Sequence, residues 1–359
     1  MLLRRSLRLA RVLRRILPLA LSALGSGFAL SAQALPAERQ ELTVDGFFYH
    51  EDEGHPYVDE IARHLERLTA GTNLKINFVF TSVQNQEQEV LNYLNAQKPA
   101  DVHPIVITHN DAKVADNVIK FAAAHDIPVV FLIRETGQEV NKYPKAWLVG
   151  ANRRNSAIHQ AEMLSAYLNA HPKWDRNGNG KLDYVLLKGA DGDTDTVVRS
   201  RTFKLSLSKQ RIAGNVIAEY FCDWRNKEAK EALQELFKTI SPEQVEAVIC
   251  NNDAMAIGAL EALQEAGYNL GTASPYTPLL GVDGDETALR RISEGSMTGT
   301  VLQDPQQFAE VSVALLKYLL LGYRFAPEEL GVELGNDARV IVPSIPITQI
   351  EARKLMGSE

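Results

Sequence analysis

The feature that most constrains the fold is an alternation of short β-rich runs with longer amphipathic stretches between residues 42 and 321. This alternation is typical of parallel sheets covered by helices. The predicted strands are 42–49, 74–80, 105–107, 129–133, 184–187, 216–221, 245–250, 279–282 and 298–302. The predicted helices include 57–68, 114–124, 156–169, 228–237, 254–267 and 305–321. The fold class expected is therefore α/β, with parallel sheets.

The first 34 residues have the pattern of a secretory signal peptide. Six arginines and no acidic residue precede the apolar run 16–30, and Ala32-Gln33-Ala34 follows it. An apolar run of 15 residues, broken by Pro18, is short for a bilayer span of about 20 residues. We expect cleavage near Ala34 and export to the periplasm.

Charge and length restrict the partners and the domain count. Loss of the six arginines with the leader changes the formal charge from −7 to −13, which argues against a nucleic-acid partner. A mature chain of this length exceeds what one hydrophobic core usually serves, so two lobes are expected.

The two cysteines leave a disulfide open. Cys222 and Cys250 each close an apolar strand-like run. An exported chain permits pairing, but a bond needs Cα atoms closer than about 7 Å. Counting alone does not decide between a bond and two free thiols.

Polar side chains follow the predicted strands at their carboxyl ends, where open parallel sheets bind ligands. After these runs come Asp191, Asp193, Asp195, Arg199, Trp224, Asn251, Asn252, Asp253, Asp283, Gln303 and Asp304. Planar carboxylates, amides and guanidinium groups suit the hydroxyls of a polyol, and an indole covers the apolar face of a sugar ring. Each Asx residue alone could equally be a helix cap or a turn former. Together they predict a site for a sugar or polyol.

A second motif predicts a structural calcium site. Asp175, Asn177, Asn179 and Asp183 occupy positions 1, 3, 5 and 9 of an EF-hand-like loop, with Gly180 at position 6. Lys181, at position 7, can contribute its backbone carbonyl, and such oxygen donors favour Ca²⁺. Position 12 is Leu186, so the closing carboxylate must come from elsewhere in the chain. An ordinary Asx/Gly-rich surface turn is the alternative.

The sequence 174–189, the segment 249–259 around Asn251-Asn252-Asp253, and the segments 281–283 and 299–302 resemble the periplasmic glucose/galactose-binding proteins of bacterial ABC transport and chemotaxis. The resemblance implies the type I periplasmic binding protein fold, with two lobes joined by three strands. The lobes expected are 40–150 plus 304–338, and 151–303 plus 339–357. Crossings are expected near 149–152, 300–304 and 337–343, with a monomer sufficing for function.

The resemblance also assigns residues. It implies that Glu246 completes the calcium site, and that sugar-binding positions fall on Asp195, Arg199, Trp224, Asn252 and Asp283. Departures from the family occur at Asp193, Gln303, Thr108, and at His55 with Tyr57, which follow an unusual acidic run at 51–53. Because half of the expected pocket differs, the bound sugar could differ as well.

The expected function is capture of a galactose- or glucose-like sugar and delivery to an ABC permease. A receptor for a sugar-like signal, partnering a chemoreceptor or membrane sensor, is the alternative. An enzyme is not expected, because neither a nucleophile–base pair nor clustered transition-metal ligands emerge from the sequence. A cytoplasmic sugar-responsive repressor is disfavoured by the leader and by the lack of a helix-turn-helix pattern.

Overall fold

The computed structural model describes residues 41–50, 57–109, 111–134, 139–271, 274–336 and 338–357. The predicted leader, its cleavage site and His55 lie outside these residues. Residues Arg39–Glu359 form one unit. Among the described residues, no helix combines the length and the apolar character needed to cross a membrane.

The largest sheet has seven strands in the order β11-β12-β5-β4-β3-β1-β2. Its strands are β1 (Leu42–His50), β2 (Leu74–Ser82), β3 (Ile105–Thr108), β4 (Val129–Leu132), β5 (Ala146–Ala151), β11 (Glu333–Leu334) and β12 (Arg339–Val342). All neighbours pair parallel except β11 with β12. The central strands β3 and β4 are buried at every residue, as parallel strands covered on both faces are.

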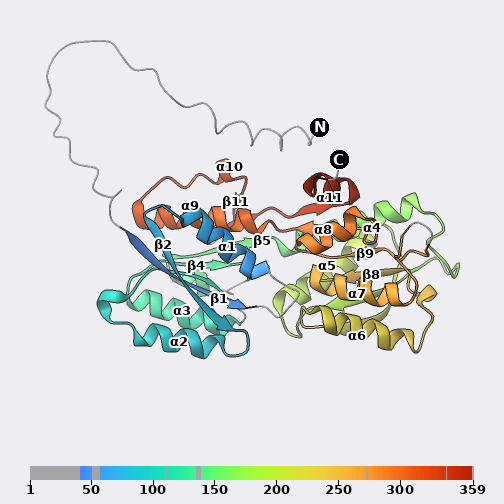
Figure 1. Ribbon diagram of the computed structural model, residues 1–359, viewed down its shortest axis with the longest axis horizontal. Helices are drawn as coiled ribbons and strands as arrows, with labels where there is room; N and C mark the ends of the chain where they lie inside the picture. Colours follow the sequence, from blue (N-terminus) through green and yellow to red (C-terminus); the bar gives the residue numbers. More distant parts are fainter. Residues whose placement is uncertain are drawn as a thin grey trace, which may run out of the picture. The chain divides into compact units, whose positions relative to one another are not determined.

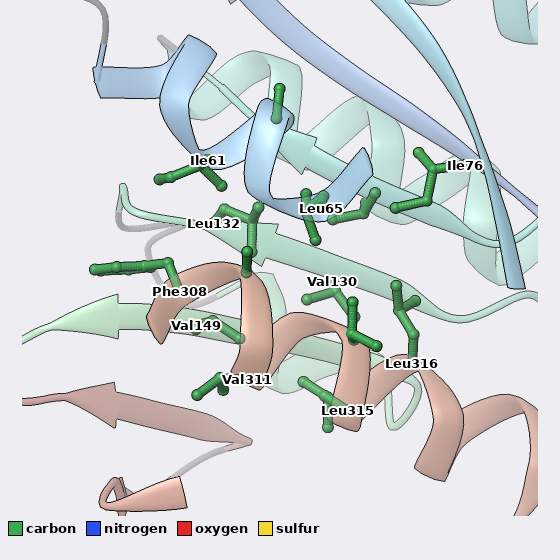
Figure 2. Close-up of a cluster of buried hydrophobic side chains, with 14 of the residues drawn as sticks. Ile61, Leu65, Ile76, Val130, Leu132, Val149, Phe308, Val311, Leu315 and Leu316 are labelled. Atoms are coloured by element: carbon green, nitrogen blue, oxygen red, sulfur yellow. The ribbon is translucent and has the colours of Figure 1, made fainter. Parts of the chain in front are cut away.

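Helices cover both faces of this sheet (Figure 1). They are α1 (Tyr57–Thr69) and α9 (Pro305–Leu321) on one face, and α2 (Gln86–Ala96) and α3 (Ala112–Ala124) on the other, with α10 (Pro327–Leu330) beside α9. Figure 2 shows side chains of α1 and α9 gathered around side chains of the sheet, namely Ile61, Leu65, Phe308, Val311 and Leu315 with Val130, Leu132 and Val149. Helix α9 therefore packs on β4 and β5, strands that end more than 150 residues earlier in the chain.

A second sheet has four parallel strands in the order β7-β6-β8-β9. The strands are β6 (Leu182–Lys188), β7 (Gly214–Phe221), β8 (Ala247–Cys250) and β9 (Leu279–Leu280). One face packs on α4 (Arg153–Ala170) and α5 (Thr194–Lys209), and the other on α6 (Asn226–Phe237), α7 (Asp253–Glu265), α8 (Glu286–Ser293) and α11 (Gln349–Leu355). The prediction of an α/β fold with parallel sheets is confirmed.

A short antiparallel pair joins β10 (Thr300–Leu302) to β13 (Ile345–Ile347). Single bridges connect Leu280 with Gly299 and Asp283 with Leu302, so β10 continues the edge of the second sheet. Three short 3-10 turns complete the described elements: η2 (Pro99–Asp101), η3 (Glu139–Lys142) and η4 (Pro242–Gln244).

One predicted boundary is wrong. Residues 339–342 were expected in the second lobe, but β12 pairs parallel with β5 in the seven-stranded sheet. The physical reason is burial: Val340 and Val342 complete the apolar cluster beneath α1 and α9. The other lobe boundaries stay a prediction.

Both cysteines are buried free thiols. Cys222 follows β7 and Cys250 ends β8, and β6 lies between these two strands. Since neighbouring strands are about 4.8 Å apart, two strand spacings exceed the Cα separation that a disulfide tolerates. The open question of the disulfide is thereby decided against a bond.

Candidate functional site

The carboxyl ends of strands from both sheets meet at one cavity of about 430 Å³, a volume that includes space open to solvent. Seven sequence-predicted residues line it: Tyr57, Asp195, Arg199, Trp224, Asn252, Asp283 and Gln303. Four further residues complete the lining: Tyr49, Val58, Ile133 and Arg134. The position agrees with the rule that open α/β sheets bind ligands beyond the carboxyl ends of their strands.

Helix α5 carries two of these side chains. Asp195 and Arg199 are separated by four residues, so they lie on the same face of the helix, one turn apart. Asp193 caps the helix, since its Oδ1 accepts from the backbone N–H groups of Asp195 at 2.7 Å and Thr196 at 3.2 Å. The first turn of α5 is thereby fixed at the edge of the cavity.

Arg199 is almost fully buried beside its partners. Its Nη1 donates to the backbone oxygen of Asn251 at 2.6 Å and lies 3.9 Å from Oδ1 of Asp283. The guanidinium centre is 5.7 Å from the ring centroid of Trp224, within the range of a cation–π contact. Strand β8 and the turn after β9 therefore hold this cation next to the indole.

Trp224 is held in a strained turn after β7. Both Asp223 and Trp224 have positive φ angles, of 47° and 67°, which non-glycine residues adopt at a cost. The backbone oxygen of Trp224 accepts a hydrogen bond from Nδ2 of Asn252 at 3.0 Å. A Cβ atom on Gly189 would lie only 2.2 Å from the indole, so the missing side chain at 189 makes room for the ring.

Asn252 holds two neighbouring segments in place. Its Oδ1 accepts from the N–H of Met255 at 3.0 Å and so caps α7, while its Nδ2 bonds Trp224. The amide thereby supports both the helix and the turn that presents the indole. Asn252 also lines the cavity, and its direct contact with a ligand stays a prediction.

A buried carboxylate supports the turn that carries Asp283. Asp253 Oδ2 accepts from the N–H groups of Gly284 at 2.7 Å and Asp285 at 3.0 Å, and its Oδ1 accepts from Thr300 Oγ1 at 2.7 Å. Burial, and next the carboxylates of Asp285 and Asp283, raise the pKa of Asp253 well above its ordinary value. Asp283 itself has a φ of 122°, so this turn too is strained at the cavity.

The wall formed by the seven-stranded sheet contains residues that sequence reasoning missed. Tyr49 lies near the end of β1, and Ile133 and Arg134 follow β4. Ile133 has a φ of 71°, and the N–H of Arg134 donates to Leu132 O at 2.8 Å, a tight turn that precedes the arginine. The strand-end rule, applied to the run 129–133, would have found Arg134.

Arg134 contacts the N-terminus of α5, a helix that packs on the second sheet. Its Nη1 pairs with Oδ2 of Asp193, and its Nε donates to the Tyr49 hydroxyl at 3.3 Å. Burial acts to lower the pKa of Arg134, but Tyr49, Asp193 and Asp195 outweigh burial and raise it. A second unpredicted arginine, Arg153 of α4, pairs through Nε with Asp195 Oδ1 at 2.8 Å.

Other predicted residues lie around this cavity but do not line it. Asp193 lines a wider outer cavity that adjoins the first. Thr108 is buried at the end of β3, where its backbone oxygen accepts from Gln86 Nε2 at 2.8 Å. The neighbouring His109 lines the outer cavity, and burial, followed by the charge of Arg134, lowers its pKa to about 4.

The predicted calcium residues converge at the other end of β6. Asp183 Oδ2 accepts from the amide nitrogens of Asn177 at 2.6 Å and Asn179 at 3.0 Å. Glu246 Oε2 accepts from the N–H of Asp183 at 2.9 Å. Asp175 accepts from the N–H groups of Asn179 at 3.1 Å and Gly180 at 2.9 Å, and Gly180 has a φ of 71° that favours glycine.

The side chains gathered in this loop carry the oxygen atoms that hard cations such as Ca²⁺ prefer. Within the described residues, no group of three His, Cys, Asp or Glu side chains is arranged as a metal site. The two amides present nitrogen to Asp183, while the oxygen of Asn177 accepts from the N–H of Asn179 and the oxygen of Asn179 accepts from the N–H of Lys181. A bound cation would therefore have to replace some of these contacts within the loop. The remaining predicted donor is the carbonyl of Lys181, whose N–H is held by Asn179 Oδ1 at 2.6 Å.

The chain is similar to known binding proteins. It matches the family described as "Periplasmic binding protein domain" over residues 47–324. The D-galactose/methyl-galactoside binding periplasmic protein of Haemophilus influenzae is 31% identical over 74% of this chain and 76% of its own length. The ribose import binding protein of Escherichia coli is 24% identical over 75% of this chain and 81% of its own length.

A solved structure shares the fold. An ABC transporter periplasmic solute-binding protein from Actinobacillus succinogenes with bound D-allose superimposes with a TM-score of 0.69 at 16% identity, covering 87% of this chain and 99% of that one. The homologues are solute-binding proteins and not enzymes. The matched segment runs from within β1 to beyond α9, and thus includes the strand ends that form the cavity. The chain therefore belongs to the type I periplasmic sugar-binding protein family.

Proposed function

We propose that this protein captures one monosaccharide, of galactose or glucose type, in the 430 Å³ cavity and delivers it to an ABC transporter. The observation that carries the proposal is the convergence of an indole, a buried guanidinium and two carboxylates on one cavity, from Trp224, Arg199, Asp195 and Asp283.

Three buried N–H groups at this cavity support a ligand rich in oxygen atoms. Nε of Arg199, Nε1 of Trp224 and Nε2 of Gln303 have no hydrogen-bond partner among the described residues. Leaving a buried donor unpaired costs about 1–3 kcal/mol, so such groups usually have a partner in the working complex. Sugar hydroxyl and ring oxygens would accept from all three.

The roles follow from these contacts. The ring of Trp224 would cover the C–H face of the sugar, and Arg199 and Gln303 would donate to its oxygens. Asp283 and the Oδ2 atom of Asp195 would accept from hydroxyls, since Arg153 takes Oδ1 of Asp195. A galactose-type ligand is supported by the name of the Haemophilus influenzae relative.

The partner and location follow from the family. Periplasmic localisation is what membership of this family implies. Transport is supported by the names of the relatives, one an import binding protein and another an ABC transporter component. Closure around the sugar would present a surface that differs from the open form, which is how a membrane partner could distinguish the two.

We further propose that residues 175–183 and Glu246 bind a structural Ca²⁺. Asp175, Asn177, Asn179, Asp183 and Glu246 would supply side-chain oxygens, and Lys181 would supply its carbonyl. The gathering of three carboxylates and two amides around one loop supports this assignment. The ion would stabilise the folded state by binding to it alone.

A thermal-unfolding panel tests the proposed function. Purified protein, freed of bound ligand by unfolding and refolding, is heated with calcium and single pentoses, hexoses or polyols. A sugar at 100 times its Kd adds about 2.7 kcal/mol to the free energy of unfolding, which raises Tm by several degrees. We expect D-galactose or D-glucose to give the largest rise. If no member of the panel raised Tm, the proposed function would be wrong.

A further inference from the structure

We propose that Arg176 anchors the loop 175–183 to the sheet, so that the loop keeps its position with or without a bound cation. The sequence motif assigns no role to this side chain, because position 2 of an EF-hand-like loop supplies no metal ligand. The inference rests on the proposed calcium site only for what calcium adds. The anchor itself consists of contacts within the protein.

The guanidinium of Arg176 holds two segments that lie outside the loop. Its Nη1 donates to the backbone oxygens of Glu243 at 3.1 Å and Val245 at 3.0 Å, just before β8. Its Nη2 donates to the backbone oxygen of Tyr276 at 2.7 Å and to Thr277 Oγ1 at 3.3 Å, just before β9. A planar guanidinium presents its donors in a fixed fork, so one side chain can join four acceptors on two segments.

Two further contacts complete the anchor. The guanidinium centre lies 5.9 Å from the ring centroid of Tyr268, within the range of a cation–π contact. The backbone N–H of Arg176 donates to Oε1 of the buried Glu246 at 2.6 Å. Since Oε2 of Glu246 accepts from the N–H of Asp183, this carboxylate joins both ends of the loop.

The hydrogen bonds within the loop give it its shape, whereas three side chains attach it to the sheet. They are Arg176, Glu246 and Asp183, whose Oδ1 accepts from Asn215 Nδ2 of β7 at 2.5 Å. Hydrogen bonds from a charged donor are stronger than those between neutral groups. Of the three side chains, Arg176 alone is not a proposed calcium ligand, so its contribution does not depend on the cation.

The anchor gathers the amino ends of three strands. The loop 175–183 leads into β6, and the segments that Arg176 holds lead into β8 and β9. Beyond their carboxyl ends, these strands lead to Arg199, Asn252 and Asp283 of the proposed sugar cavity. Fixing the amino ends by protein contacts therefore supports the sugar site even when calcium is scarce.

Hydrogen–deuterium exchange of the backbone amides in 175–183, measured by mass spectrometry, tests the anchor. The proteins are the wild type, Arg176→Leu, Arg176→Lys and Lys173→Leu, each in a chelator and in excess calcium. The ratio of two exchange rates reports the ratio of the local opening constants. Lys173→Leu is the control, because it removes one positive charge from an exposed side chain close to the loop.

In the chelator, the wild-type loop should exchange at least about tenfold more slowly than an unstructured peptide. Arg176→Leu should exchange at least about tenfold faster than the wild type, the equivalent of about 1.4 kcal/mol. Arg176→Lys keeps the charge but not the fork, so it should exchange at least about threefold faster. Lys173→Leu should match the wild type.

Excess calcium should return Arg176→Leu at least to the protection that the wild type has in the chelator. The physical reason is that a cation which binds only the closed loop lowers the fraction of open loop. This rescue separates an anchor from a general loss of folding, which calcium at one loop would not reverse. If Arg176→Leu does not fold, Arg176→Lys provides the same comparison.

The outcomes are distinguishable. Equal exchange of the wild type and Arg176→Leu in the chelator would overturn the inference, as would a wild-type loop that exchanges there like an unstructured peptide. Faster exchange of Arg176→Leu that calcium does not slow would support the anchor and refute the proposed metal site. None of these results depends on sugar binding, which the thermal panel tests separately.

Discussion

Gly189 makes room for an aromatic ring of the proposed sugar site. The backbone at 189 approaches the Trp224 ring so closely that even a methyl group would collide with it. Because the turn at Asp223 and Trp224 is already strained, it has little freedom to move away.

Substitution Gly189→Ala should therefore displace the indole and weaken sugar binding by at least about tenfold, the equivalent of about 1.4 kcal/mol. Calorimetric titration with the best sugar measures the loss. Trp224→Ala removes the ring altogether, so it gives the largest loss of affinity and should abolish binding while the protein stays folded. A Gly189→Ala variant with wild-type affinity would show that the ring is not the binding surface.

His109 should make the protein sensitive to mild acid. Its pKa is about 4 in the folded state and about 6.5 in an exposed imidazole. Between these values the unfolded chain binds a proton that the folded protein does not, so the free energy of unfolding falls as the pH is lowered from 6.5. Lowering the pH from 6.5 to 5 should cost on the order of 2 kcal/mol.

Urea unfolding at several pH values checks this expectation, with His109→Gln as the matched variant. Glutamine keeps a polar side chain that does not titrate. The variant should lose less stability than the wild type over this pH range, whatever its stability at pH 7. Parallel losses would show that other groups account for the acid sensitivity.

At the scale of elements, sequence reasoning located the strands and helices it named but not their partners. The nine predicted strands all appear, with ends shifted by a few residues, whereas β5, β11, β12 and β13 were not predicted. β5 contains Gly150 and is bounded by Pro144, which weakens its pattern. The placement of β12 was wrong because strand pairing is decided by tertiary burial, which a single sequence pattern does not encode.

The site was predicted to a similar extent. Strand-end reasoning identified most of the lining residues because parallel topology brings those ends together. It does not show that Asn252 also caps α7 and supports the turn of Trp224, because these contacts depend on how the elements pack. Arg134 follows the predicted strand 129–133, so the same strand-end rule extends to it.

The loop 175–183 should couple calcium to stability. Substitution Asp175→Ala removes one predicted oxygen ligand and two hydrogen bonds to backbone N–H groups. In excess calcium the wild type should gain about 3–4 kcal/mol at concentrations several hundred times the Kd, and the variant should lose most of that gain. With a chelator present, the two proteins should differ by only about 1 kcal/mol.

Thermal unfolding with calcium and with a chelator measures both differences. Asp191→Ala, an exposed aspartate outside the loop, is the control and should respond as the wild type does. A full calcium response in Asp175→Ala would refute the metal assignment.

For the whole molecule, stability should be independent of reducing agents. A disulfide typically contributes about 2–4 kcal/mol, but Cys222 follows β7 and Cys250 ends β8, and β6 lies between these strands. We expect the same Tm, within about 1 °C, with and without dithiothreitol. A thiol reagent should label neither cysteine in the folded protein and both after unfolding, because both side chains are buried. A Tm that fell on reduction would contradict this strand order.

The late position of β12 has a consequence for synthesis. The seven-stranded sheet needs residues 339–342 beside β5, which ends at Ala151. At about 5–20 residues per second, roughly 10–40 s pass on the ribosome between the appearance of the two strands. During that interval one edge of β5 has no partner strand. The seven-stranded sheet can therefore finish folding only after nearly all of the chain has been made.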